Sequence, residues 1–274
     1  MSLCDRLLFG ISGLPIGTGK KLNYAAAIPY LKDLGLDAME MLFVRSVNVS
    51  DKNKVAILDS KVKNGFYLSA HGSYYINLNA DMQNMQQASI RRITEGAEAL
   101  AKVQSRSLVF HAGYYLNDSQ EKAYATVKKN LARLPNIGIQ YRLETTGKRT
   151  QFGTLEELVS ICKEVDSCNL CVDFAHIHAR GIGSLKKYDD FARILEFISR
   201  ELGRRALDDL HIHMGGIAYS SKGENHHLPV RESDFNYKAC LRALKDFKVK
   251  GCVICEGPRV EKDAIFLKTT FKSL

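Results

Sequence analysis

The regular alternation of short apolar runs with helix-like segments is the feature that most limits how this chain can fold. Each run is rich in apolar or β-branched residues and is five to seven residues long, which is typical of a buried strand. The runs are 7–12, 38–43, 67–71, 107–111, 139–144, 170–176, 210–214 and 251–256. Because a longer segment separates each run from the next, we expect the strands to lie parallel in one sheet, joined by helical crossovers.

The segments between the runs carry apolar residues at helical spacing. Three such stripes are Ile90, Ile93, Ala97 and Leu100; Phe191, Ile194, Leu195, Ile198 and Leu202; and Tyr237, Cys240, Leu241 and Leu244. Spacings of three, four and seven residues place each stripe on one helix face. Further helices are expected over 23–34, 52–63, 118–133, 154–165 and 260–272. Thr154, followed three residues later by Glu157, matches a capping box.

Eight strands alternating with eight helices predict an α/β fold, a single (β/α)8 TIM barrel formed by residues 1–274 as one domain. A doubly wound open sheet is the alternative, but it usually has fewer strands and a glycine-rich first turn. The segment 17–20, Gly-Thr-Gly-Lys, is the candidate for such a turn, and it lacks the spacing of a phosphate loop. We therefore favour the closed barrel.

Composition and charge limit the class of protein and its partners. With 45% hydrophobic and 25% charged residues, the chain has the composition of a folded globular protein. Lys and Arg exceed Asp and Glu by nine, which fits either an anionic partner or a basic surface that only aids solubility. No apolar stretch approaches ~20 residues, and the first residues lack the apolar segment of a signal peptide. We expect a cytoplasmic protein with no membrane partner.

Two pairs of cysteines have the CxxC form that can indicate a zinc site. They are Cys168 with Cys171 and Cys252 with Cys255. Each pair lies in an apolar, β-branched run, where positions i and i+3 face opposite sides of a strand. We therefore interpret these cysteines as core residues with reduced thiols.

Histidines and carboxylates gather at the carboxyl ends of six consecutive predicted strands. In chain order they are His71, His111, Glu144, Asp173 with His176, His211 with His213, and Glu256. Glu224, His226 and His227 follow in the loop after the seventh strand. The carboxyl ends of barrel strands meet at one mouth, where active sites lie. A buried histidine is often only a core residue, but that reading does not explain the same feature in six strands.

The clustered side chains favour a divalent metal centre. Unpaired carboxylates and imidazoles packed together would be costly without a compensating cation. Mixed His, Asp and Glu ligands suit Zn²⁺, Mn²⁺ or iron, and there are more of them than one ion needs. Two or three ions are therefore expected. A cluster of divalent ions is suited to phosphoryl chemistry, because it activates a water and stabilises the attacking and leaving oxygens.

Seven motifs, from the second quarter of the chain to the last, resemble those of a known family. HGSYYINL, FHAG, LETTG, DFAHIHARG, HMGG, GENHH and CEGP, in this order over residues 67–258, resemble the endonuclease IV family of apurinic/apyrimidinic endonucleases. The resemblance implies a zinc-dependent phosphodiester hydrolase of base excision DNA repair, with three zinc ions at the mouth of a TIM barrel and manganese as a partial substitute. Its ligands would be His71, His111 and Glu144 for the first ion; Glu144, Asp173, His213 and Glu256 for the second; and His176, Glu224 and His226 for the third.

The resemblance also implies a substrate. The enzyme would hydrolyse the phosphodiester 5′ of an abasic site in double-stranded DNA, leaving a 3′-hydroxyl, with Glu144 as the catalytic carboxylate. Tyr74, Tyr75 and Asn77 match the loop that enters the duplex beside the extruded nucleotide, although the two tyrosines could equally pack at the barrel mouth. Arg45 is a candidate phosphate contact or a solvated surface residue. We expect a monomer, associated with the nucleoid if the source is prokaryotic.

Some residues leave alternatives open. Glu224 stands where the family pattern has Asp, and His211 competes with His213 as the ligand on the seventh strand; we favour His213 because it lies nearer the carboxyl end. Arg142 points into the barrel by strand parity, and we interpret it as a counter-charge to the acidic ligands. The rival function is a xylose-isomerase-like sugar isomerase or epimerase with one divalent ion. It would use only Glu144, Asp173, His213 and Glu256, which leaves the remaining histidines without a purpose.

Overall fold

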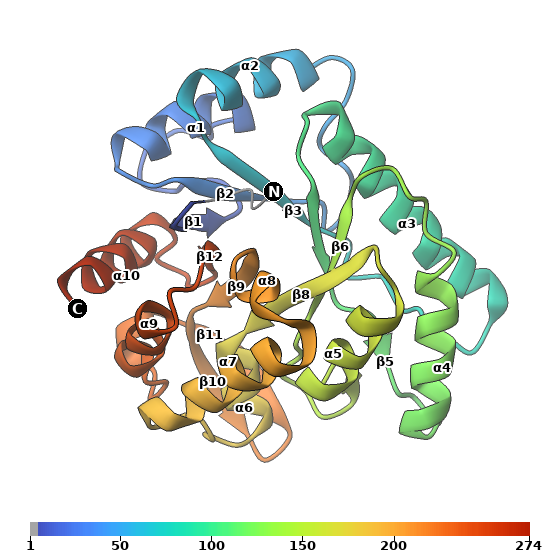
Figure 1. Ribbon diagram of the computed structural model, residues 1–274. Helices are drawn as coiled ribbons and strands as arrows, with labels where there is room; N and C mark the ends of the chain where they lie inside the picture. The colour runs from blue at the N-terminus through green and yellow to red at the C-terminus, as the bar shows by residue number, and fades with distance from the viewer. Residues whose placement is uncertain (1–4) are drawn as a thin grey trace.

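A computed structural model describes residues 5–274 of the chain. Eight strands close into a barrel in which each strand pairs in parallel with the next one along the chain, and the last pairs with the first. Figure 1 shows this ring of strands at the centre of the molecule. The strands are β1 (Leu7–Ser12), β2 (Ala38–Leu42), β3 (Tyr67–His71), β4 (Ser107–Phe110), β6 (Gln140–Glu144), β8 (Cys168–Asp173), β9 (Leu210–Met214) and β12 (Gly251–Cys255). The predicted (β/α)8 barrel is confirmed.

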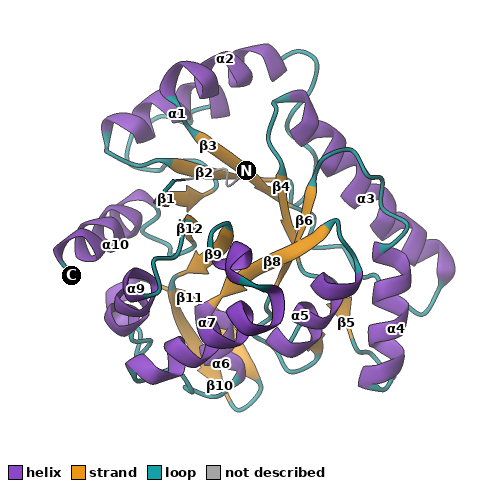
Figure 2. Ribbon diagram, in the orientation of Figure 1, coloured by secondary structure: helices purple, strands orange, loops and turns teal. Residues whose placement is uncertain are grey.

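Helices form the outer ring of the barrel (Figure 2). They are α1 (Tyr24–Asp33), α2 (Lys54–Asn64), α3 (Gln83–Lys102), α4 (Gln120–Leu131), α5 (Leu155–Glu164), α6 (Phe174–Arg180), α7 (Tyr188–Leu202), α8 (Arg204–Leu207), α9 (Tyr237–Asp246) and α10 (Glu261–Ser273), with a 3₁₀ turn at η1 (Val230–Glu232). The apolar stripes face inward as predicted: α7, for example, buries Phe191, Leu195 and Ile198. None of the helices in residues 5–274 is long and apolar enough to cross a membrane.

The predicted capping box begins α5. The hydroxyl of Thr154 accepts the backbone N–H of Glu157 at 3.2 Å, and the Glu157 carboxylate accepts the backbone N–H of Thr154 at 2.9 Å. Both contacts satisfy N–H groups that would otherwise lack partners at the first turn of the helix.

The predicted carboxyl-terminal boundary of the strand over 170–176 is wrong. β8 stops at Asp173, and Phe174 begins α6. The cause is local: the Asp173 carboxylate accepts the backbone N–H of His176 at 2.7 Å, which makes Asp173 the N-cap of a helix rather than a strand residue. His176 therefore lies on the first turn of α6, above the barrel.

Two small antiparallel sheets, which the sequence did not predict, lie beyond the carboxyl ends of the barrel strands. One is β10 (Gly216–Ser220) with β11 (Gly223–Leu228), and the other is β5 (Gly113–Tyr114) with β7 (Gln151–Phe152). The β10–β11 hairpin corresponds to the segment read from the sequence as the loop after the seventh strand. These sheets bring loop residues onto the mouth of the barrel.

The barrel interior is more polar than a typical one, in which branched apolar residues dominate. Arg142 is buried as expected, but the idea that it balances the acidic ligands is wrong. Its guanidinium donates to Asp209 Oδ2 at 2.8 Å and to the hydroxyl of Ser107 at 2.8 Å, near the amino-terminal end of the barrel. Because these partners lie at the opposite end of the strands from Glu144, Arg142 secures the base of the barrel.

Asp37 joins the first and last elements of the barrel. Its buried carboxylate accepts from the guanidinium of Arg6 at 2.8 Å and from the backbone N–H of Phe9 at 3.2 Å, and it pairs with the ammonium of Lys268 on α10. Burial alone would raise the pKa of Asp37, but the two cations lower it below its usual value. This contact therefore stabilises closure while the carboxyl group is ionised.

Candidate metal centre

The predicted ligands converge at the carboxyl-terminal mouth of the barrel. His71 ends β3, Glu144 ends β6 and Asp173 ends β8, while His111 and Glu256 directly follow β4 and β12. The parallel register places these ends at the same level of the barrel. Consequently, side chains that are far apart in the sequence share one site.

Glu144 lies at the centre of this site and is buried. Its Oε2 atom lies 2.9 Å from Nε2 of His71 and 3.1 Å from Nε2 of His111. Its Oε1 atom lies 3.1 Å from Nδ1 of His213 and 3.2 Å from Nδ1 of His176. One carboxylate thus contacts four histidines, two on each oxygen, as a carboxylate that bridges two cations would.

Three groups of side chains at the mouth have ligand atoms that all lie within 4.8 Å of one another. They are His71, His111 and Glu144; Glu144, Asp173, His213 and Glu256; and Asp173, His176, His227 and Glu256. The first two correspond to the ligand sets expected for the first and second ions. The third group shares two members with the second, so the three groups form one continuous cluster.

The structure places His227, not His226, at the third group. A bulge in β11 opposite Ala218 and Tyr219 of β10 leaves Asn225 without a partner in the ladder. Because an extra residue reverses the alternation of side chains, Glu224 and His227 share the inner face and His226 is exposed. The expectation of a Glu-x-His pair depended on unbroken alternation, and a bulge is difficult to read from sequence.

Glu224 lies next to the third group but is not one of its four members. Its Oε2 atom lies 3.6 Å from Nε2 of His176, and its backbone N–H donates to the carbonyl of Gly147 at 3.1 Å. The ring of His176 is 5.4 Å, centre to centre, from that of His227. Glu224 is therefore within reach of the cluster from the hairpin side.

The electrostatics of the cluster indicate missing positive charge. Burial tends to lower the pKa of His71, but the Glu144 carboxylate raises it to about 9; burial lowers the pKa of His111 to about 4. Burial also opposes ionisation of Glu144 and Glu256, yet the neighbouring histidines hold the pKa of Glu144 well below its usual value and that of Glu256 at about 2. Burial raises the pKa of Asp173. These opposing shifts show strong interaction among closely packed carboxylates and imidazoles, an arrangement that a divalent cation would stabilise.

Unpartnered buried atoms support the same conclusion. Oδ2 of Asp173, Nδ1 of His111 and Nδ1 of His227 are buried without a hydrogen-bond partner among the described residues. Leaving such atoms unsatisfied is costly, and a divalent cation in the cluster would satisfy Oδ2 of Asp173. His111 and His227 face the carboxylates of Glu144 and Glu256 through Nε2, the nitrogen that such a cation would contact. The donor set therefore fits divalent metal ions.

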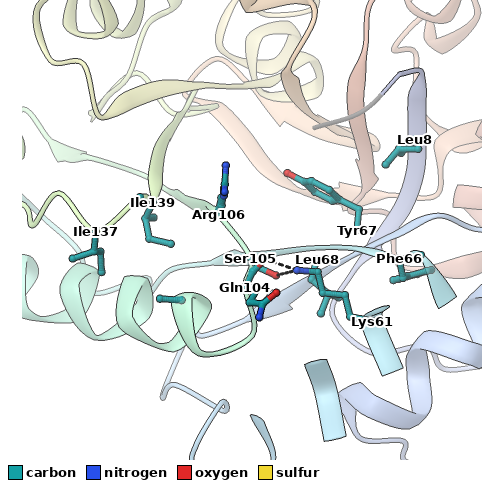
Figure 3. A pocket seen from close by; sticks show the side chains of 13 residues that line it. Leu8, Lys61, Phe66, Tyr67, Leu68, Gln104, Ser105, Arg106, Ile137 and Ile139 are labelled. Atoms are coloured by element: carbon teal, nitrogen blue, oxygen red, sulfur yellow. Dashed lines mark hydrogen bonds between the residues drawn. The ribbon is translucent and has the colours of Figure 1, made fainter. Parts of the chain in front are cut away.

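A cavity of about 610 Å³ opens onto this cluster. Its lining includes His71, His111, Glu144, Tyr74 and Lys148. A larger cavity of about 860 Å³ lies at the amino-terminal ends of the strands (Figure 3). The side chains that line it include Lys61 and Ser105, which are hydrogen-bonded to each other, but no histidine or carboxylate of the described residues. This cavity therefore offers no candidate metal ligands.

The residues predicted to contact DNA differ in their exposure and in their contacts. Tyr74 and Tyr75 each expose 67% of their surface, and the guanidinium of Arg92 lies 5.8 Å from the centre of the Tyr75 ring. Arg45 is also exposed, on the loop after β2. By contrast, the side-chain oxygen of Asn77 accepts backbone N–H groups from Asn79 and Tyr114, so Asn77 fixes the loop that carries the tyrosines.

The site also contains an acidic residue, Glu40, that was not predicted from the sequence. Glu40 of β2 is fully buried and lies beside both His211 and His213, 2.9 Å and 3.0 Å from their Nε2 atoms. His213 faces the cluster and His211 lies deeper in the barrel, which agrees with the choice of His213 as the ligand. The signal for Glu40 was present: a single acid inside the apolar run AMEML.

With this geometry in place, comparison with known proteins defines the class. A profile of the xylose isomerase-like TIM barrel family matches residues 28–269. The chain belongs to this family. Its members include enzymes with endonuclease IV and epimerase activity.

Two related sequences and two solved structures illustrate which proteins this chain resembles. The chain is 41% identical over 274 residues to an uncharacterized protein of Methanocaldococcus jannaschii, covering 98% of each chain. It is 25% identical over 211 residues to a probable endonuclease 4 of Chloroflexus aggregans, covering 71% of this chain and 73% of that one. Endonuclease IV of Thermus thermophilus superposes with a TM-score of 0.73 at 19% identity, over 97% of this chain and 98% of that one. A D-tagatose 3-epimerase-like protein gives a TM-score of 0.73 at 20% identity, over 97% and 96%.

Proposed function

We propose that this protein is a zinc-dependent apurinic/apyrimidinic endonuclease that hydrolyses the phosphodiester 5′ of an abasic site. The observation that carries the proposal is the surplus of ligands around Glu144. Four histidines contact its two oxygens, and the surrounding side chains form three overlapping groups. A single ion would leave several of these buried groups unpaired.

The first two proposed ligand sets are groups found at the mouth, and the third combines His176 and His227 of the third group with the neighbouring Glu224. The three sets are His71, His111 and Glu144; Glu144, Asp173, His213 and Glu256; and His176, Glu224 and His227, the last replacing the expected His226. When bound, divalent ions lower the pKa of a coordinated water and stabilise charge on the attacking and leaving oxygens. Glu144 would belong to two of these sets, and although burial opposes its ionisation, His111, His213 and His176 hold its pKa well below the usual value.

Charge and shape at the mouth fit a DNA phosphate. With Glu144, Asp173, Glu224 and Glu256 assigned to metal, the rest of the chain carries a surplus of 13 basic over acidic residues. Lys148 lines the cavity itself. The exposed rings of Tyr74 and Tyr75 can fill the space left by an extruded nucleotide, as apolar wedges do in other complexes. An abasic nucleotide has no base to unpair, so its extrusion costs less than that of a normal one.

An incision assay tests the proposal. The full chain, loaded with zinc, is incubated with a duplex that contains one abasic site and, separately, with the undamaged duplex. We expect a 5′ cut at the abasic site, which is lost in Glu144→Gln and retained in Glu196→Gln, a change at an exposed position on α7. Absence of cleavage by the fully metallated wild type across a wide pH range would refute the assignment.

A sugar epimerase or isomerase with one divalent ion is the second candidate. The specific observation that favours it is that Glu144, Asp173, His213 and Glu256 alone form a compact four-ligand set. This set offers one histidine and three carboxylates, which suits a harder cation such as Mn²⁺. Metal analysis separates the two: about three zinc ions per chain support the endonuclease, and one ion per chain supports the epimerase.

A further inference from the structure

A chain of buried polar groups lies beneath the candidate metal centre, on the inner wall of the barrel. Glu40 of β2 is its central member and has no exposed surface. Its Oε2 atom lies 2.9 Å from Nε2 of His211 and accepts the hydroxyl of Ser69 at 3.0 Å. Its Oε1 atom lies 3.0 Å from Nε2 of His213. A carboxylate in this position is costly unless it is paired, so the contacts require an explanation.

His213 presents its two ring nitrogens to different carboxylates. Nδ1 lies 3.1 Å from Oε1 of Glu144 and 3.5 Å from Oε2 of Glu256, on the side of the metal centre. Nδ1 forms a hydrogen bond with Oε1 of Glu144. Nε2 of His213 and Oε1 of Glu40 lie 3.0 Å apart but form no hydrogen bond with each other or with any other described residue, so two buried polar atoms lie side by side unpaired. A neutral imidazole carries one proton, so a proton on Nε2 leaves the lone pair of Nδ1 for a cation.

His211 completes a consistent arrangement of protons. Its Nδ1 atom lies 3.2 Å from Sγ of Cys252. If the thiol donates to this nitrogen, the Nε2 proton of His211 points to Glu40. The carboxylate of Glu40 then accepts from His211 and Ser69 through Oε2, and a proton on Nε2 of His213 would satisfy the unpaired Oε1 atom as well.

We propose that Glu40 is a positioning residue that keeps His213 protonated on Nε2 and directs Nδ1 toward the cation shared with Glu144 and Glu256. The inference rests on the metal centre of the proposed function and not on its substrate, since a cation at this position needs the same lone pair in either candidate enzyme. Partners that orient a metal-bound histidine typically contribute 10- to 100-fold to metal affinity.

Zinc titration of the metal-free full chain, in competition with a chromophoric chelator, tests the role of Glu40. In Glu40→Gln the amide oxygen can accept from one histidine, but its NH₂ group faces the other. We expect one zinc site to weaken about 10- to 100-fold in this variant. Ser69→Ala is the matched control, because it removes a contact to the same carboxylate and leaves His213 untouched. Zinc affinities of Glu40→Gln within twofold of wild type, or an equal loss in Ser69→Ala, would overturn the inference.

A second measurement needs no variant and therefore does not depend on whether Glu40→Gln folds. Long-range ¹H–¹⁵N spectra of the zinc-loaded wild type report which nitrogen of each imidazole is protonated. A proton on Nε2 of His213 supports the inference, and a proton on Nδ1 overturns it. Failure of the wild type to bind zinc would instead overturn the proposed function itself, so the two failures are distinguishable.

Discussion

Replacing Gly147 with alanine should displace one side of the metal centre. Gly147 lies in the loop after β6, and a Cβ atom there would lie 2.6 Å from both Cβ and Oε2 of Glu224 and 3.1 Å from Cδ2 of His176. The carboxylate oxygen can rotate away. The Cβ atom of Glu224 cannot, because it is fixed to the backbone, so relief of the overlap requires β11 and the loop that carries Gly147 to move apart.

The size of the effect follows from that overlap. An ordinary contact begins near 3.4 Å, so the two backbone segments must separate by about 0.8 Å, and any shift of β11 carries His227 with it. Misplacing a group at an active site by about 1 Å can reduce the rate about 100-fold, whereas overpacking costs about 1–3 kcal/mol of folding free energy. We therefore expect Gly147→Ala to remain folded, to lose the zinc ion proposed to bind His176, Glu224 and His227, and to incise abasic DNA about 100-fold more slowly.

Metal analysis of the dialysed protein, single-turnover incision and thermal unfolding measure the three quantities separately. Gly96→Ala is the control: it lies in α3, and a Cβ atom there would meet side-chain atoms of Leu108 at an ordinary 3.4 Å. A Gly147→Ala protein with its full zinc content and an incision rate within twofold of wild type would show that β11 does not transmit the overlap.

Further substitutions test the centre and the fold. His227→Ala should bind one zinc ion fewer and His226→Ala should bind the normal number, as measured by metal analysis; equal losses would contradict the placement of the β11 bulge. Asp37→Asn should lower the free energy of unfolding at pH 7 by about 1–3 kcal/mol in urea denaturation. Because pairing with cations such as Lys268 lowers the pKa of Asp37, its contribution is present above about pH 4 and is lost as the pH falls through the lowered pKa, so the variant should be less acid-sensitive than wild type. Leu195→Ala, fully buried on α7, should cost about 2–5 kcal/mol; a much smaller loss would mean that the helix repacks.

Much of the fold was predictable because its signals are local. Strand-length apolar runs and helix-length stripes such as Phe191, Leu195 and Ile198 depend only on which side chains must leave water. The same applies to Thr154 and Glu157, whose capping contacts span three residues. The end of β8 was misjudged because the Asp173 side chain competes for the backbone, and that outcome depends on its N-cap geometry.

The candidate site was partly predictable for a topological reason. Parallel strands bring their carboxyl ends to one mouth, so residues such as His71, Glu144 and Glu256 could be grouped from their position in the runs alone. Glu40 was not predicted because it lies inside a strand, below the mouth. The predicted role of Arg142 as a counter-charge to the acidic ligands was wrong. Strand parity gives the direction of a side chain across the sheet and not its position along the barrel axis.

The order of amino acids alone was enough to predict the barrel, its polarity and a mouth rich in candidate metal ligands. Folding decided the rest: the bulge that turns His227 inward and His226 outward, the two oxygens of Glu144 shared among four histidines, and Glu40 beneath His213. These contacts join residues up to 173 positions apart, counted from Glu40 to His213, and they depend on register and depth within the closed sheet. Such quantities arise only when all eight strands are in place.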